Sequence, residues 1–163
     1  MSRQLFLLTV TPVQSFIMAA RKTQDLLAGS YILSHLSRTV ISVMKDRYNA
    51  ELIFPSERVK SLPNRVLAIF EADEDHEQLQ QIGNDLERAI QSEFMNMAEH
   101  VWHFLRSFQL PVHLVRENFI QQIERYFQIY WVFHPLDGQS YAEAYRRIEA
   151  AAGSIKNVRK FEQ

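Results

Sequence analysis

The sequence predicts an α+β fold, because short apolar runs with strand character alternate with long stretches of helical periodicity. The first apolar run, residues 4–10, stops abruptly at a Thr-Pro pair and is typical of a buried strand. The longest helical stretch, residues 75–106, repeats apolar residues at steps of three and four. Eleven Phe, six Tyr and two Trp among 163 residues supply the bulky side chains that a core requires.

A helix is expected directly after the first strand. Thr11 stands at the N-cap position, Pro12 at the first helical position and Gln14 three residues after the cap, which is a capping-box pattern. Apolar residues recur at helical spacing until the Gly-Ser pair at 29–30 interrupts them. We therefore expect a helix, a break near Gly29, and a second helix that ends near Arg47.

The other elements follow from the same periodicities. Further strands are expected at 51–54, 65–71 and 127–133, and further helices at 75–106, 116–125 and 141–152, the last stopped by Gly153. The apolar stripe of the long helix comprises Leu79, Ile82, Leu86, Ile90, Phe94, Met97, Val101 and Leu105. The order of the first elements matches the split βαβ pattern of a ferredoxin-like sheet with its long helices on one face.

The composition restricts the class of protein. There is no cysteine, which excludes disulfides, zinc-thiolate sites and thiol catalysis. The formal charge of -1 gives no overall field that would attract nucleic acid. The apolar run at the start is too short for a signal peptide or a membrane span, so we expect one domain, 1–163, in the cytoplasm and away from membranes.

The junction between the first strand and its helix is the first candidate site. A helix N-terminus offers backbone N–H groups and positive potential to a phosphate. Ser15 adds a hydroxyl, and Arg21 and Lys22 add cations. Gly29 permits close backbone approach, and Ser30 is suited either to capping the next helix or to binding a ligand. A capped helix with a solvated basic turn is the alternative interpretation.

Three further clusters have simpler interpretations. The acidic cluster at 71–77 suits the first turn of the long helix better than a cation site. His100 and His103 share a helix face as a possible metal pair, but no third ligand is evident and we expect them to flank the core stripe. The basic tail at 154–163 is either a solvated face or a contact to RNA or a neighbouring chain. No metal ligand and no catalytic residue is predicted.

Several runs in the chain resemble a known family. They resemble the large, signature subunit of type III CRISPR RNA-guided complexes, most closely the type III-B (Cmr) form. The matching runs are PVQSFI at 12–17, ARKTQDL at 20–26, AGSYILS at 28–34, FP at 54–55, LPNR at 62–65 and KNVRKFEQ at 156–163.

The resemblance implies a fold and a function. In that family the large subunit carries two palm-like domains related in fold to nucleotidyl cyclases, and this chain is similar to the first. ATP binds between the palms, and the second palm supplies a Gly-Gly-Asp-Asp motif that holds metal ions. The product is cyclic oligoadenylate, an antiviral messenger made when target RNA is bound. The resemblance implies that one wall of this pocket contains Gln14, Ser15, Phe16, Gly29, Ser30 and Ser34, with Arg21 and Lys22 near phosphate or a partner surface.

The sequence also departs from the complete family pattern. A His-Asp nuclease domain, the Gly-Gly-Asp-Asp motif and the zinc-ribbon cysteines are absent, and Thr9–Thr11 provide no aspartate where cyclases place a metal ligand. Gln24 and Leu27 replace an expected arginine and an aromatic residue. We therefore expect a fragment or one piece of a split protein that is catalytically silent alone.

Its expected partners are a second palm, the other subunits of the effector complex and, indirectly, guide and target RNA. Two alternatives remain open at this stage. One is a non-catalytic module that docks neighbouring subunits or RNA through its basic tail and aromatic strand. The other is a self-sufficient nucleotidyl cyclase, which the missing carboxylates disfavour.

Overall fold

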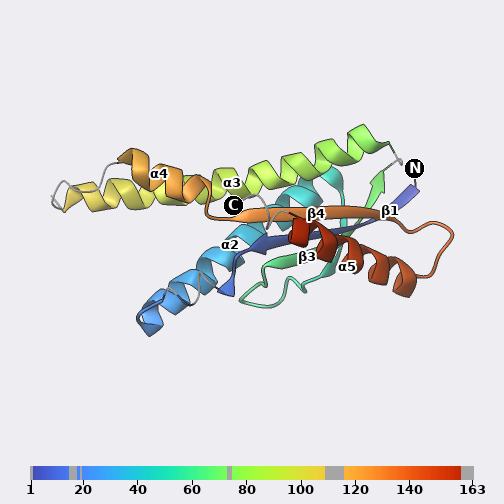
Figure 1. The fold of residues 1–163 in the computed structure, drawn as a ribbon, viewed down its shortest axis with the longest axis horizontal. Coiled ribbons are helices and arrows are strands. Elements are labelled where there is room, and N and C mark those ends of the chain that lie inside the picture. Colours follow the sequence, from blue (N-terminus) through green and yellow to red (C-terminus); the bar gives the residue numbers. More distant parts are fainter. Residues whose placement is uncertain (1, 15–17, 19, 73–74, 109–115, 159–163) are drawn as a thin grey trace.

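The computed structural model describes residues 2–14, 18, 20–72, 75–108 and 116–158. Within this part of the chain, four strands form one antiparallel sheet in the order β2-β3-β1-β4 (Figure 1). The strands are β1 (Ser2–Thr11), β2 (Glu51–Phe54), β3 (Arg65–Ala72) and β4 (Gln128–Pro135). The helices are α2 (Thr23–Tyr48), α3 (His76–Ser107), α4 (Arg116–Glu124) and α5 (Tyr141–Val158). The predicted α+β class and the four predicted strands are confirmed.

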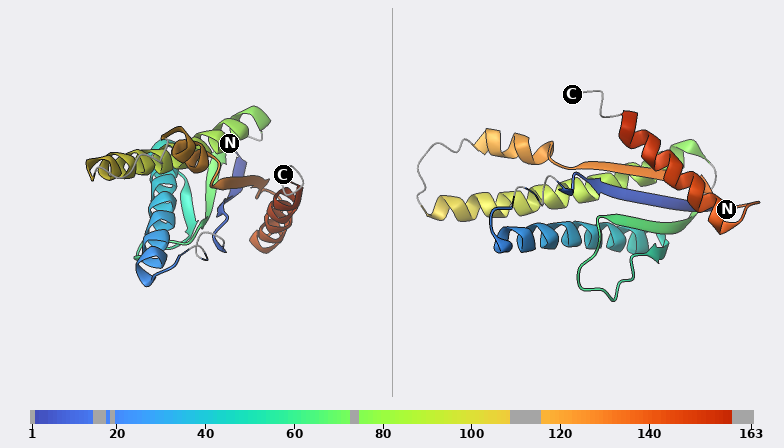
Figure 2. Two further views of the ribbon diagram at one scale, coloured as in Figure 1. Left: turned by 60° about the vertical axis from the view of Figure 1, so that its left-hand side comes forward. Right: turned by 60° about the horizontal axis from the view of Figure 1, so that its bottom comes forward.

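The sheet is covered on both faces. Phe6 and Leu8 of β1 face the core formed with α2 and α3, whereas Leu5 and Leu7 face α5. Figure 2 shows α2 and α3 side by side on one face and α5 across the other. Because β1 is central and buried on both faces, its sequence is apolar at consecutive positions rather than at alternate ones. This is why the strand was recognisable from the sequence.

Three phenylalanines from neighbouring strands form the centre of the main core. The ring of Phe6 on β1 lies 5.2 Å from that of Phe70 on β3 and 4.6 Å from that of Phe133 on β4. The Phe70 and Phe133 rings meet edge to face at 5.5 Å. Aromatic pairs of this kind contribute about 0.5–1.5 kcal/mol each beyond the area that they bury. They therefore help to fix the order of the three strands.

Two predictions for the segment from the end of β1 into α2 are wrong. Thr11 is not a helix N-cap but the last residue of β1, and its Oγ1 donates a hydrogen bond to the Gln128 carbonyl at 3.3 Å. The predicted break at Gly29 is also wrong, since α2 is continuous from Thr23 to Tyr48. The helix starts where the Asp25 carboxylate accepts the backbone N–H groups of residues 21 and 22. A single interior glycine costs about 1 kcal/mol, which a helix of this length and packing tolerates.

The predicted long helix is confirmed as α3. Asp75 caps its start by accepting a hydrogen bond from the Glu77 backbone N–H at 3.1 Å, as the acidic cluster suggested. The predicted apolar stripe is correct up to Phe94. Beyond it the buried residues are Ala98 and Trp102, and the predicted Met97 and Leu105 are half-buried. Val101, predicted to be in the stripe, is 50% exposed.

The stripe shifts because the end of α3 packs against α4 instead of the sheet. The Trp102 ring stacks on that of Phe119 in α4 with centroids 5.6 Å apart. Figure 1 shows this part of α3 running past the sheet with α4 alongside it. The side from which a neighbouring element packs determines which face of a helix is buried. The spacing of apolar residues in the sequence does not reveal that side.

The last helix is longer than predicted. Gly153 does not stop α5, which continues to Val158. A Cβ at Gly153 would meet no atom within 4 Å, and its φ is not positive. The glycine therefore neither breaks the helix nor permits a close contact. No described helix combines the length and apolar character that crossing a bilayer requires.

One glycine does permit a close contact between β4 and α3. The indole of Trp131 lies flat against Gly83, where an added Cβ would come within 2.5 Å of three ring carbons. Trp131 also donates a hydrogen bond from Nε1 to the Glu87 carboxylate at 3.2 Å. Gly83 is thus the position that allows α3 to approach the sheet.

Replacing Gly83 with alanine is expected to destabilise the protein by about 1–3 kcal/mol, because the indole and the helix must move apart. The measurement is urea unfolding. Gly153→Ala is the matched control, since it lies in a helix with open space around it, and it should stabilise the protein by up to about 1 kcal/mol. Equal effects of the two substitutions would contradict the packing argument.

A polar cluster joins the end of α2 to α3. The hydroxyl of Tyr48 donates to the Asp85 carboxylate at 2.6 Å, and Arg88 and Arg47 also contact that carboxylate. The hydrogen bond from Tyr48, followed by the contacts with the two arginines, lowers the pKa of Asp85 against the opposing effect of burial. Burial and the neighbouring Asp85 carboxylate raise the pKa of Tyr48, which keeps its phenol protonated.

The depressed pKa of Asp85 makes this cluster sensitive to acid. Its stabilising contribution is present above the unfolded value of about 3.9 and is lost as pH falls through the lower folded pKa. Tyr48→Phe should therefore destabilise the protein most at neutral pH and progressively less below about 3.9. Urea unfolding over a pH series checks this, with Tyr145→Phe on α5 as control. A penalty that does not change with pH would refute the assignment.

Candidate functional site

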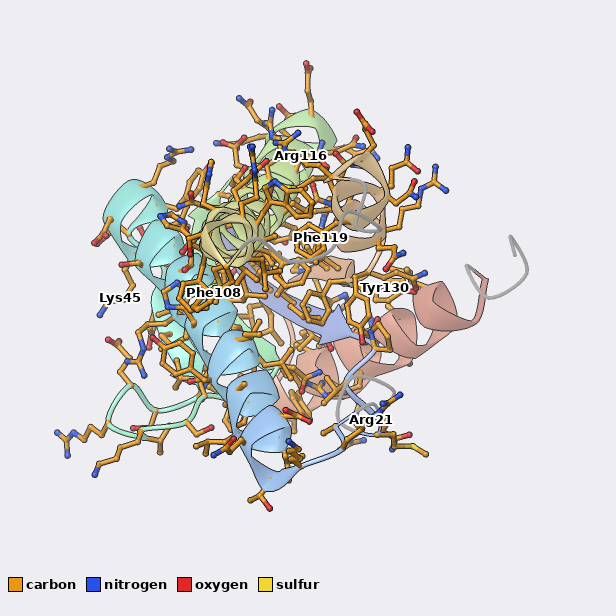
Figure 3. All side chains as sticks on the ribbon, turned by 90° about the vertical axis from the view of Figure 1, so that its left-hand side faces the viewer. Arg21, Lys45, Phe108, Arg116, Phe119 and Tyr130 are labelled. Atoms are coloured by element: carbon orange, nitrogen blue, oxygen red, sulfur yellow. The ribbon has the colours of Figure 1, made fainter. Side chains whose placement is uncertain are left out.

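The exposed part of the predicted ligand wall lies between β1 and α2. Gln14, Arg21 and Lys22 are all exposed. In Figure 3 Arg21 projects beside the N-terminal end of α2. Ser15 and Phe16, predicted to line the same wall, lie outside the described residues. Two cations directly before α2 and one amide three residues after β1 are therefore accessible.

The rest of the predicted wall lies on the first half of α2. Gly29 and Ser34 are buried, whereas Ser30 is exposed. Ser30 and Ser34 are one helical turn apart and point toward the connection between β2 and β3. Both side chains therefore contact other parts of the protein itself.

Three serines of α2 hold that connection. Ser30 Oγ lies 3.3 Å from Ser61 Oγ, and Ser34 Oγ accepts a hydrogen bond from the Leu62 backbone N–H at 2.9 Å. Ser37, one turn further, donates to the Pro63 carbonyl at 2.6 Å. The Ser34 hydroxyl is thus hydrogen-bonded within the protein, and its contact with a ligand stays a prediction.

The same connection is tied to the end of β1. Asn64 donates from Nδ2 to the Val10 carbonyl at 2.8 Å, and the Val10 N–H donates to the Asn64 carbonyl at 2.9 Å. A continuous series of hydrogen bonds therefore runs from α2 through residues 61–64 to β1. We name residues 30, 34, 37 and 61–64 the serine clamp. It fixes the position of the helix relative to the exit of the strand.

Sequence reasoning missed the part that Ser37 and Asn64 play. A signal was present, since Ser30, Ser34 and Ser37 follow at steps of four and three and must share one face of a helix. Ser34 and Ser37 are buried, and buried hydroxyls need hydrogen-bond partners. The sequence does not identify those partners, because they lie in a connection 26–31 positions away along the chain.

The electrostatics of the α2 start differ from those of a bare helix N-terminus. The Asp25 carboxylate accepts the backbone N–H groups of Arg21 and Lys22 at 3.1 and 3.0 Å. It therefore already occupies the position that an anion would take at these amides. A phosphate group here would be held by the side chains of Arg21 and Lys22, and both are exposed and long enough to reach it.

β1 ends in Thr9, Val10 and Thr11, none of which carries a carboxylate. Thr9 is buried, and its neighbours in register are Arg65 on β3 and Tyr130 on β4. Among the described residues, no group of three or more His, Asp or Glu side chains is placed to hold a metal ion. His100 and His103, predicted to flank the core stripe, are both exposed, and the Nδ1 of His100 lies 2.7 Å from the Asn96 carbonyl.

The basic tail is described only in part. Residues 154–158 belong to α5, so the predicted polar tail begins as helix. Arg146 and Arg147 are exposed on the same helix. Arg159 and Lys160 lie outside the described residues.

The sequence matches the family model for CRISPR-associated protein Cmr2, N-terminal, over residues 5–99. The match runs from β1 through most of α3 and includes the whole of α2 and the serine clamp. The chain belongs to this family. Cmr2 is the large subunit of type III-B CRISPR effector complexes, so the resemblance found in the sequence is confirmed at this level. Comparison with curated proteins gives no match.

In this Cmr2 domain, Ser34→Ala is expected to leave the buried Leu62 N–H without a partner and to destabilise the protein by about 1–3 kcal/mol. Urea unfolding measures the loss, and hydrogen exchange at Leu62 should speed up. Ser42→Ala is the control, because Ser42 lies on the exposed side of α2 and bonds Asp46 within the same helix. Unchanged exchange at Leu62 would show that the clamp does not hold the connection.

Proposed function

We propose that this Cmr2 domain is a palm-like domain that forms one wall of an ATP pocket, completed by a second palm, for cyclic oligoadenylate synthesis. The family match over residues 5–99 carries this proposal, because it includes the entire segment 12–34 from which the wall is built. The chemistry of the exposed side chains, two cations and an amide beside a buried glycine, supports it.

The sheet supports the palm assignment. The antiparallel order β2-β3-β1-β4 is the order of a ferredoxin-like sheet, in which β1-α2-β2 and β3-α3-β4 are two interleaved βαβ units. In this arrangement α2 and α3 cover one face together. We propose that 1–163 form this single domain and that α4 and α5 are additions to it.

The residues of this chain would bind and orient ATP rather than transform it. Arg21 and Lys22 would contact phosphate oxygens, Gly29 would allow the nucleotide close to α2, and Ser30 would donate a hydrogen bond. Metal ions held by the second palm would supply the charge that nucleotidyl transfer requires. The threonines at the end of β1 offer no substitute for carboxylate ligands.

The test is ATP affinity in the assembled effector complex. The double substitution of Arg21 and Lys22 by alanine should weaken ATP binding by about tenfold or more, because each cation makes a charge-assisted hydrogen bond. Ser30→Ala should weaken it less. The matched control replaces Arg106 on α3 and Arg125 after α4, two exposed cations outside segment 12–34, and should leave the affinity unchanged. Full ATP affinity in the Arg21 and Lys22 variant would refute the pocket.

A second candidate function is a non-catalytic interaction module. Exposed apolar side chains near the start of α2 favour it, with Met18 83%, Leu27 73% and Tyr31 66% exposed. Such a surface suits contact with a neighbouring subunit. This function predicts that the Arg21 and Lys22 variant binds ATP normally but assembles less well with its partners, which the same experiment distinguishes by co-purification.

A further inference from the structure

A cleft lies beside α5, on the face of the sheet opposite to α2. It encloses about 440 Å³ and is lined by Ile53, Phe54, Arg65, Leu67, Tyr141 and Tyr145. Leu67 on its floor belongs to the small core beneath α5, which places the cleft on that face. The cleft arises because α5 packs mainly on β4 and β1, leaving part of β3 and the edge strand β2 uncovered. Its volume lies within the range of small-molecule sites, about 300–1,000 Å³.

Aromatic side chains form much of the wall of this cleft. The rings of Tyr141 and Tyr145, one turn apart on α5, stack with centroids 6.2 Å apart and planes inclined by 19°. They are 46% and 38% exposed, and Phe54 across the cleft is 46% exposed. Partial burial, together with the neighbouring Tyr145, raises the pKa of Tyr141, so its phenol stays protonated and able to donate a hydrogen bond. Exposed, ordered ring faces are suited to stacking against a planar ligand.

Arg65 is the charged residue in the cleft wall. Its guanidinium is ion-paired with Glu149 of α5, which orients it, and its side chain remains 34% exposed. A planar guanidinium beside aromatic rings favours a planar ligand that accepts hydrogen bonds and stacks. The Glu149 carboxylate is engaged with Arg65, so the cleft offers little to a cationic ligand. Flat rings, phenol hydroxyls and a fixed guanidinium are together the groups that recognise nucleobases.

We propose that this cleft binds a planar nucleobase, supplied either by a free nucleotide or by a strand of RNA. The base would stack on the exposed ring of Tyr145 or Phe54, with Arg65 and the Tyr141 hydroxyl directed at its edge or its phosphate. The cleft lies on the face of the sheet that α5 covers, whereas α2, which carries part of the proposed ATP wall, packs on the other face.

The test is calorimetric titration of the full chain with AMP, with ribose 5-phosphate and with a short oligoadenylate RNA. AMP and the RNA should bind, and ribose 5-phosphate, which lacks the base, should bind far more weakly. Tyr145→Leu removes the ring and should weaken binding by about 5- to 150-fold, the usual effect of losing one stacking partner. Tyr145→Phe keeps the ring and should retain binding.

Phe104→Leu is the matched control, since Phe104 is an exposed aromatic residue on α3 and should not affect binding. Circular dichroism and thermal unfolding establish that each variant is folded. Tighter binding of the RNA than of AMP identifies a strand as the source of the base, and equal binding identifies a free nucleotide.

Three results would overturn the proposal. The first is no binding of AMP or RNA. The second is binding that ribose 5-phosphate reproduces. The third is AMP binding that Tyr145→Leu leaves intact while Ser30→Ala weakens it, which would assign the nucleotide to α2 and leave the proposed function standing. Conversely, AMP binding that Tyr145→Leu abolishes and Ser30→Ala leaves intact would support the cleft without testing the α2 wall.

Discussion

Burial of β1 on both of its faces is the constraint on which the other elements depend. The strand pairs with β3 over eight positions and with β4 over eight, so it organises the whole sheet. Leu5, Phe6, Leu7 and Leu8 are at most 1% exposed. Fully burying a side chain of this size contributes about 1.5–3 kcal/mol. The two helical layers pack against alternate residues of this one strand, so each layer loses its support if the strand changes register.

The hydrogen bonds of the serine clamp fix the position of α2 relative to β1. Apolar burial is not directional, whereas the hydrogen bonds from the Leu62 N–H to Ser34 and from the Asn64 side chain to Val10 each specify a single geometry. They connect α2, which carries Gly29, Ser30 and Ser34 of the proposed wall, with the end of β1. Arg21 and Lys22, proposed for the same wall, are exposed.

The two faces of the sheet suit different roles in this Cmr2 domain. On the α2 side, the exposed cations Arg21 and Lys22 precede the helix, and β1 ends in Thr9, Val10 and Thr11, none of which carries a carboxylate. On the α5 side, aromatic rings and one guanidinium surround a cleft.

The sequence by itself determined the strands, the long helix α3, the family and the absence of cysteine chemistry. These depend on local periodicity and on a contiguous motif, which one chain contains in full. Tertiary structure alone decided the shift of the buried face of α3 to Trp102, because α4 packs against that part of the helix. The start of α2 depends instead on a local contact, in which Asp25 accepts the backbone N–H groups of residues 21 and 22. The sequence could not predict the hydrogen-bond partner of Ser34 or the assembly of the aromatic cleft. Both depend on contacts between segments that are far apart in the sequence.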